Sequence, residues 1–296
     1  MRICVIFNPM AKGSKARRFR AGLDKIGGQA VLKMTRSAGD ARTLAAEAVG
    51  GGFDCIVAAG GDGTLNEVLN GIGGAPQGLE SVAVGVLPLG TVNVFARELG
   101  IPPSLEGAWK VILSGRQKSL DLASAETGLA HDRKVQWFAQ LAGAGLDARS
   151  IQLLDWELKK RIGPLSYVVA GLKALREAKA KIIVTGADER LEGELVLVGN
   201  GSLYGGNFKT FETAAMDDGL LDVCVFPKVD FGVLARCGGP LLLAGRLPES
   251  QVRRMKAAEF TLTSDSECAF ELDGELAGQL PVKFAVARRR LRVMVP

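Results

Sequence analysis

The stretch GGDGTLNEV, residues 60–68, decides the fold, because it places a glycine-rich turn with one carboxylate between a strand and a helix. Residues 55–59 (CIVAA) form the apolar run of a buried parallel strand. After the turn, apolar residues recur at helical spacing: Leu65, Val68, Leu69 and Ile72. Thr64 and Glu67 have the spacing of a capping box at the helix start. Because glycines let backbone N–H groups approach an anion, the stretch predicts a phosphate-binding turn; the alternative is an ordinary strand-to-helix turn.

Asp62 adds a second requirement to this turn. A carboxylate beside a polyphosphate is repelled unless Mg²⁺ lies between the two. The turn therefore predicts a metal–nucleotide complex rather than a bare phosphate.

Two further strand-and-turn units support a binding site. Residues 82–87 are an apolar strand pattern that leads into PLGTVN, residues 88–93, and residues 3–7 lead into Asn8-Pro9. In open parallel sheets, ligands bind beyond the carboxyl ends of the strands. We therefore expect the three turns to converge at one edge of a sheet.

The change of pattern along the chain predicts two domains. Strands and helices alternate first, with helices expected near residues 15–26, 40–49 and 105–113. Afterwards, strand patterns dominate, with one helix near 166–178; the strands are expected at 136–141, 181–185, 194–198, 220–226, 259–263 and 281–286. We expect an α/β nucleotide-binding domain over residues 1–118, with a parallel sheet and flanking helices. A β-rich antiparallel sandwich follows over residues 119–286.

Composition narrows the class of protein. The five cysteines form no CxxC pair, and an odd count with no leader pattern favours core packing in a reducing cytoplasm. The sequence contains no run of 18 apolar residues, so it predicts no transmembrane segment. His131 is the sole histidine, which argues against a Ser-His-Asp triad or a histidine zinc site. Carboxylates are therefore expected to carry any acid–base chemistry.

The net charge of +5 includes three basic clusters, at residues 12–20, 159–161 and 253–256. They are either solvated faces or a surface for anionic lipid headgroups, which attract each cation by roughly 1 kcal/mol. With two tyrosines and no basic stretch interleaved with aromatic residues, nucleic acid is not expected as a partner. The oligomeric state is left open, with a homodimer as one possibility.

Seven motifs in order carry a family resemblance: FNP (7–9), GGDGTLNEV (60–68), PLGTVN (88–93), LDLA (120–123), GAGLDA (143–148), MDDGLLDV (216–223) and ELDGE (271–275). With them the chain resembles the soluble bacterial diacylglycerol kinase-like lipid kinases, which are related to sphingosine and ceramide kinases. GGDG alone also occurs in NAD kinases and phosphofructokinases. The resemblance implies that residues 287–296 return to the first domain, and that the enzyme associates transiently with the membrane surface from the cytoplasm.

The resemblance also implies a reaction, in which a lipid hydroxyl attacks the γ-phosphate of ATP between the domains, with Mg²⁺ present. ELDGE by itself predicts a hairpin with two solvated acids; the resemblance instead places the general base there, as Glu275 with Asp273 as partner or alternative. Asp62 would assist catalysis. The nucleotide-binding residues would be Asn8, Thr35, Gly60, Gly61, Asp62, Gly63, Thr64, Leu65, Asn66, Glu67, Gly90, Thr91 and Asn93.

Two metal positions follow from the same resemblance. Asp62 and Asp121 would belong to a network of carboxylates, water and Mg²⁺ in the cleft. Asp218, with the main-chain carbonyls of Ala215 and Leu220, would bind a second, structural Mg²⁺. Without the resemblance, MDDG predicts a type I turn before a strand.

The chain departs from the family pattern at two places. Val94 stands where many members have an aspartate of the metal network, and valine neither ligates a metal nor holds a water. Thr213-Ala214 replaces a common proline-alanine pair, which we expect to alter only a loop. Three hypotheses remain: a lipid kinase, a kinase of the same fold for a soluble acceptor such as NAD, and a nucleotide-binding module without turnover.

Overall fold

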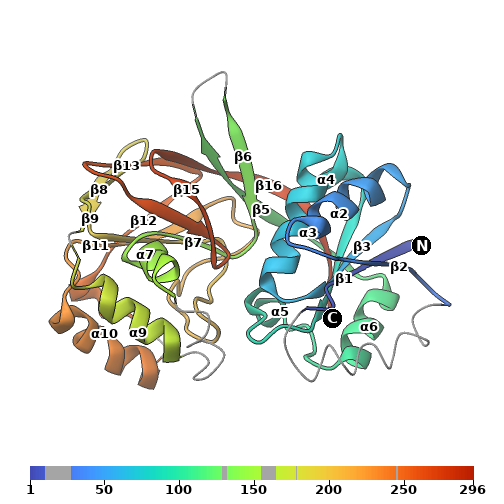
Figure 1. Cartoon of the computed structure of the whole chain (residues 1–296), viewed down its shortest axis with the longest axis horizontal. Helices are drawn as coiled ribbons and strands as arrows, with labels where there is room; N and C mark the ends of the chain where they lie inside the picture. Colours follow the sequence, from blue (N-terminus) through green and yellow to red (C-terminus); the bar gives the residue numbers. More distant parts are fainter. Residues whose placement is uncertain (11–27, 129–131, 155–164, 178, 245) are drawn as a thin grey trace.

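Two lobes lie side by side, and the long strands β5 (Gln117–Thr127) and β16 (Val282–Met294) connect them (Figure 1). The structure is a computed structural model that describes residues 1–10, 28–128, 132–154, 165–177, 179–244 and 246–296. The helix expected near 15–26, the basic clusters at 12–20 and 159–161, and His131 therefore lie outside the described residues.

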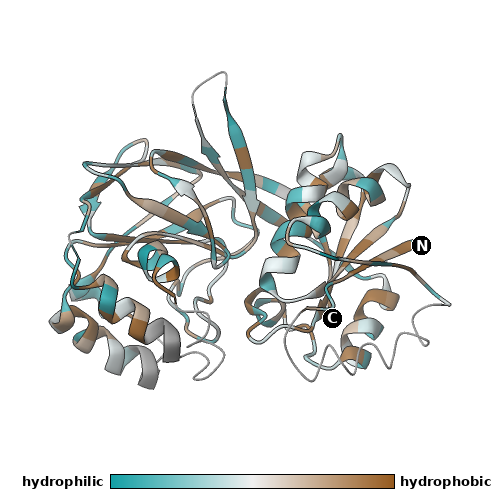
Figure 2. Ribbon diagram, in the orientation of Figure 1, coloured by the Kyte–Doolittle hydropathy of each residue, from teal (hydrophilic) through white to brown (hydrophobic). Residues whose placement is uncertain are grey.

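The N-terminal lobe is built on a parallel sheet in the order β2-β1-β3-β4. Its strands are β1 (Ile3–Phe7), β2 (Val31–Met34), β3 (Cys55–Gly60) and β4 (Ala83–Pro88). Its helices are α2 (Asp40–Gly50), α3 (Asp62–Gly74), α4 (Gly78–Ser81), α5 (Val94–Glu98) and α6 (Leu105–Ser114). Figure 2 shows hydrophobic residues along the central strands and polar residues on the flanking helices. β1, β3 and β4 are buried at every position, as their apolar runs predict.

The C-terminal lobe packs two sheets face to face. One is six-stranded and antiparallel, in the order β12-β11-β10-β7-β14-β15. Its strands are β7 (Leu141–Gly145), β10 (Leu195–Gly199), β11 (Leu221–Phe226), β12 (Arg253–Ala257), β14 (Ala269–Leu272) and β15 (Glu275–Gln279). The facing layer consists of β5, β16, β6 (Lys134–Phe138), β8 (Ile182–Thr185), β9 (Arg190–Gly193) and β13 (Glu259–Ser264). The predicted class, an α/β domain followed by an antiparallel sandwich, is confirmed.

Aromatic residues fill the space between the two sheets. Phe284 stacks on Phe260 with ring centroids 5.3 Å apart and meets the edges of Phe138 and Phe270 at 5.7 and 6.2 Å. The outer face of the six-stranded sheet is covered by α9 (Leu165–Ala174) and α10 (Phe231–Ala244), beside which α7 (Leu146–Gln152) follows β7 (Figure 1). A single-turn η1 (Glu249–Gln251) precedes β12. All five cysteines are buried and none forms a disulfide, so they pack in the cores as expected.

Strand β16 joins the two lobes within one continuous sheet. Its first residues pair with β13 and β5, and near its end Arg292 and Val293 pair in parallel with Ala83 and Val84 of β4. The predicted strand at 136–141 is wrong in one respect, because the chain changes sheets there and divides into β6 and β7. Among the described helices, none combines the length and the hydrophobicity needed to cross a bilayer.

Candidate active site

The three predicted turns meet at the carboxyl ends of β1, β3 and β4. Backbone N–H groups of Leu89 and Gly90 donate to the carbonyl of Gly60 at 2.9 and 3.1 Å, and Asn8 Nδ2 donates to Thr64 Oγ1 at 3.2 Å. A Cβ at Gly90 would come within 2.5 Å of the Cα of Gly61, so glycine lets the two turns touch. The expected convergence of the turns is confirmed.

The predicted capping box is wrong. Glu67 accepts hydrogen bonds from the N–H groups of Gly39 at 2.9 Å and Ala41 at 3.1 Å, and thus caps the start of α2. α3 begins after Gly61, and within the described part of the chain no side chain caps that start. The first N–H groups of α3 therefore remain suited to an anionic ligand.

Asp62 accepts from the N–H groups of Asn93, Val94 and Phe95 at the start of α5. Burial, and then the negative charge of Asp273, raise the pKa of Asp62 to about 6, although these hydrogen bonds oppose the shift. Val94 is 8% exposed, so the position that often carries an acid here contributes a backbone donor and an apolar side chain.

The remaining predicted nucleotide residues differ in their surroundings. Asn93 adopts a left-handed conformation (φ 55°) and binds its own turn: its Oδ1 accepts from Gly90 N at 3.0 Å and its Nδ2 donates to Gly90 O at 2.8 Å. Thr35 is buried next to the end of β1, and Thr91 is exposed. Leu65 belongs to the hydrophobic core.

Asp273 accepts four hydrogen bonds, one of which joins the two lobes. Its Oδ1 accepts from the backbone N–H groups of Gln140 and Leu141 at 3.0 and 3.1 Å. Its Oδ2 accepts from Ala139 N at 3.0 Å and from Asn66 Nδ2 of α3 at 3.1 Å. The three backbone N–H groups, those of residues 139–141, belong to the segment where the chain changes sheets. The carboxylate therefore satisfies donors that no strand partner reaches. Burial nevertheless raises the pKa of Asp273.

Glu275 lies across from the GGDG turn (residues 60–63). A Cβ at Gly63 would overlap Glu275 Oε1, which places this carboxylate against the first turn of α3. Glu275 as a whole residue is exposed to solvent. Burial of its carboxylate, followed by the charges of Glu67 and Asp273, raises the pKa of Glu275. Asp62, Gly63 and Glu275 thus come from both lobes to one site.

The MDDG turn (residues 216–219) is closed by internal hydrogen bonds. Asp218 Oδ1 accepts from Leu220 N at 2.9 Å, and the carbonyl of Ala215 accepts from Asp218 N at 3.4 Å. Asp121, which is 1% exposed, accepts from Gly219 N at 2.6 Å. Asp121 therefore holds this turn, whereas the neighbouring acid that raises the pKa of Asp62 is Asp273.

A lysine lies beside Asp218, one of the three expected ligands of the second Mg²⁺. Lys256 Nζ lies 3.5 Å from Asp218 Oδ2 and 3.1 Å from Asp222 Oδ2, and donates to the carbonyl of Thr213 at 2.7 Å. Among the described residues, no group of three or more His, Cys, Asp or Glu could hold a metal ion. An ammonium in this position repels a divalent cation, so the turn does not fit the expected structural Mg²⁺. The Thr213 side chain also donates to Asp222 Oδ1 at 2.9 Å, so this departure shapes the cluster as well as the loop.

Several residues of the site were missed by sequence reasoning. Asn70, one turn after Asn66 on α3, donates to the carbonyl of Trp137 at 2.8 Å and accepts from its N–H at 2.8 Å. Glu98 of α5 accepts from Leu203 N at 2.8 Å and from Gln140 Nε2 at 2.9 Å. The available signal was the helical spacing of Asn66 and Asn70 on a largely buried helix. These contacts tie α3 and α5 to the other lobe.

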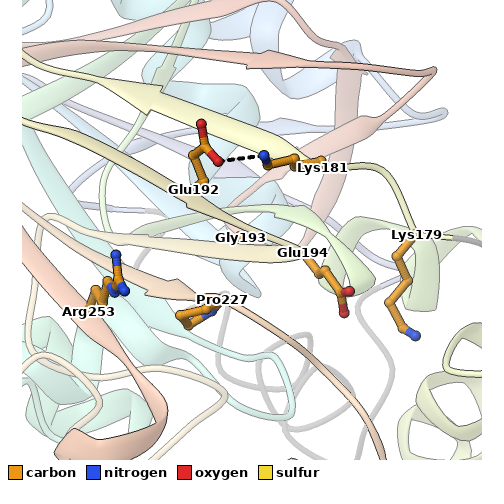
Figure 3. A pocket seen from close by; sticks show the side chains of 7 residues that line it. All are labelled: Lys179, Lys181, Glu192, Gly193, Glu194, Pro227 and Arg253. Atoms are coloured by element: carbon orange, nitrogen blue, oxygen red, sulfur yellow. Dashed lines mark ion pairs between the residues drawn. The ribbon is translucent and has the colours of Figure 1, made fainter.

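A pocket of about 400 Å³ lies elsewhere, at the far side of the C-terminal lobe near β8, β9 and β12 (Figure 3). It is lined by Lys179, Lys181, Glu192, Gly193, Glu194, Pro227 and Arg253. Lys181 and Glu192 form an ion pair at 2.5 Å, and Glu194 accepts from Val229 N at 2.7 Å. None of the predicted site residues lines this pocket.

The comparisons with known proteins agree with the motifs. The family profile described as "Diacylglycerol kinase catalytic domain" matches residues 2–125, and the profile "YegS C-terminal NAD kinase beta sandwich-like domain" matches residues 140–295. A diacylglycerol kinase of Staphylococcus saprophyticus is 30% identical over 99% of this chain and 94% of its own length. A diacylglycerol kinase of Staphylococcus aureus strain MRSA252 is also 30% identical, over 99% of this chain and 91% of its own length.

Solved structures share the fold. A putative diacylglycerol kinase from Bacillus anthracis superimposes with a TM-score of 0.80 at 24% identity, over 100% of this chain and 95% of that chain. A second structure of a putative diacylglycerol kinase from the same organism gives 0.79 at 23% identity, over 100% and 97%. The motifs, both family profiles and the full-length relatives lead to one conclusion: the chain belongs to the diacylglycerol kinase-like family.

Proposed function

We propose that the protein is a lipid kinase that transfers the γ-phosphate of ATP to a hydroxyl of diacylglycerol or a related lipid in the cleft between its lobes. The contact of the Glu275 carboxylate with Gly63 carries this proposal, because it sets a proton acceptor from one lobe against the phosphate turn of the other. We further propose that residues 1–118 and 287–296 form the nucleotide-binding domain and residues 119–286 the lipid domain.

The triphosphate would bind at the uncapped start of α3, where the first backbone N–H groups of the helix could donate to its oxygens. Asn8, Thr64 and Gly90 come from adjoining turns and would complete the pocket. Mg²⁺, when bound with ATP, supplies positive charge that neutralises the phosphate oxygens. Asp62 fits as its carboxylate partner, since a group with a pKa of about 6 is ionised at neutral pH.

Glu275 would act as the general base. A raised pKa suits a group that accepts a proton from an attacking hydroxyl. Asp273 is less suited, because its two oxygens already accept four hydrogen bonds and protonation would break at least one of them. Asp273 would instead hold the Glu275 turn against α3, so that catalysis rests on positioning.

Two of the cations at residues 253–256, which the sequence suggests could bind anionic lipid headgroups, are engaged within the protein. Arg254 donates to the carbonyl of Thr210 at 3.0 Å, and Lys256 is engaged at the MDDG turn. Transient association would therefore depend on other cations than these two.

The test supplies the protein with Mg²⁺, labelled ATP and, separately, vesicles of diacylglycerol, sphingosine, ceramide or phosphatidylglycerol. Label in a lipid product is the expected result, and transfer to none of these lipids would contradict the proposal. NAD belongs in the same panel, because its phosphorylation would instead indicate a soluble acceptor. ATP binding without transfer to any acceptor would indicate a binding module.

A further inference from the structure

Two acids contact each other beneath the turn that carries Glu275. Glu271 of β14 is 0% exposed and hydrogen-bonds to Asp147, in the first turn of α7. The charge of a second carboxylate, that of Asp273, also disfavours ionisation of Glu271. A buried carboxylate without a cation is costly, so this arrangement needs a proton.

The position of the oxygens shows where that proton lies. A Cβ at Gly143 of β7, the residue paired with Glu271, would overlap Asp147 Oδ2 and come within 3.0 Å of Glu271 Oε1. The two oxygens therefore lie over the same glycine. Glu271 Oε1 receives no hydrogen bond from any described donor, as expected of a protonated oxygen that itself donates.

Asp147 is the acceptor of this pair. Burial raises the pKa of Asp147, but this carboxylate also accepts from the hydroxyl of Tyr204, and both hydrogen bonds oppose the shift. Burial and the charge of Asp147 raise the pKa of Glu271 well above its usual range. Glu271 is thus neutral and Asp147 is the carboxylate.

The second oxygen of Glu271 reaches the catalytic turn. Glu271 Oε2 accepts from Gly274 N at 2.6 Å, and Gly274 has φ 89° immediately before Glu275. We propose that neutral Glu271, hydrogen-bonded to Asp147, is a positioning residue that holds the 273–275 turn so that the Glu275 carboxylate lies against Gly63. The catalytic part of this inference rests on the proposed function of Glu275.

Two substitutions separate the neutral donor from the charge. In Glu271→Gln, the amide donates to Asp147 and its oxygen accepts from Gly274, so most of the parent kcat should remain. In Glu271→Leu, both hydrogen bonds are lost, and kcat should fall about 10²-fold with KM for ATP unchanged, as small displacements of a reacting group can cause. A glutamine variant as impaired as the leucine variant, or a leucine variant with the parent kcat, would overturn the proposal. Glu249→Leu, the same change at an exposed position of η1, is the control.

Two measurements do not depend on activity. The infrared difference spectrum between the parent and Glu271→Gln at neutral pH should show the carbonyl stretch of a protonated carboxyl in the parent only; its absence would refute a neutral Glu271. Amide hydrogen exchange at residues 273–276 should be faster in Glu271→Leu but not in Glu271→Gln, and equal exchange in both would refute the positioning. If the parent phosphorylates no acceptor, these two readouts still decide the inference while the kinase proposal fails.

Discussion

Two acidic turns, the GGDG turn and the MDDG turn, look alike in sequence but differ in what surrounds their carboxylates. At the GGDG turn, Asp62 faces backbone N–H groups and a second acid, Asp273; burial, and then the charge of Asp273, raise the pKa of Asp62 to about 6. At the MDDG turn, Asp218 and Asp222 lie beside the ammonium of Lys256. At the GGDG turn two acids repel each other, whereas at the MDDG turn a lysine of the chain offsets part of the charge of two carboxylates.

The difference shows that an acidic motif predicts a cation without specifying which one. A lysine can take the place of a divalent ion when its ammonium reaches two carboxylates and a carbonyl, as at Thr213, Asp218 and Asp222. Functional sites tend to retain charges that the fold leaves uncompensated. Of the two turns, the GGDG turn is therefore the better candidate for binding a metal–nucleotide.

The largest expected effect concerns the acid that faces the GGDG turn. Glu275→Gln should lower kcat for lipid phosphorylation by about 10²- to 10⁴-fold, because the attacking hydroxyl loses its proton acceptor. KM for ATP should change little. Steady-state kinetics with the preferred lipid of the parent provide the measurement, and Glu249→Gln serves as the control. Parent-like turnover in Glu275→Gln would move the general base elsewhere.

The next effect concerns the contact between the lobes. Asp273→Asn should lower the free energy of unfolding by about 3 kcal/mol, because an amide nitrogen cannot accept from Ala139 N or Asn66 Nδ2 and leaves these donors unsatisfied. Urea denaturation measures this loss, with Asp188→Asn on an exposed turn as the comparison. A loss no greater than that of Asp188→Asn would show that the four hydrogen bonds add little.

Much of the nucleotide side of the site could be predicted from local patterns. Buried apolar runs followed by glycine turns are local signals, and they placed β1, β3, β4 and the GGDG turn correctly. α10 was missed, because Gly238, Gly239 and Pro240 within it are typical of a loop. β16 was predicted too short, because the arginines 288–290 interrupt its apolar pattern.

Long-range partners could not be predicted from spacing. Glu67 reaches α2 instead of its own helix start, which reverses the capping-box hypothesis. Lys256 meets Asp218 only because β12 lies beside β11, whose strand follows the MDDG turn. In both cases the motif correctly predicted an acidic residue that binds a partner, but it predicted the wrong partner. The tertiary packing decides which donor or cation reaches the carboxylate.

The charge balance of the MDDG turn is open to a direct test. Lys256→Met should lower the free energy of unfolding by about 2 kcal/mol, since it leaves Asp222, whose side chain is 9% exposed, without its cation. Mg²⁺ should then stabilise the variant, whereas EDTA should leave the parent melting temperature unchanged. Thermal unfolding with Mg²⁺ or EDTA measures both. Adding Asp218→Asn should remove the Mg²⁺ effect, and a parent destabilised by EDTA would restore the structural metal.

The smallest expected effect sharpens the comparison through pH. The pKa of Asp62 is raised from 3.8 to about 6 in the folded protein, so the folded state binds the proton more tightly than the unfolded state. The ionised carboxylate therefore costs stability above pH 6, and this cost disappears as the pH falls below about 4. Asp62→Asn should be about 1 kcal/mol more stable than the parent at pH 8 and equal to it at pH 4, although it loses kinase activity. Urea denaturation at the two pH values measures the difference. A variant less stable than the parent at pH 8 would mean that the hydrogen bonds from the N–H groups of α5 outweigh the repulsion from Asp273. The charge of the GGDG turn would then be as well balanced as that of the MDDG turn.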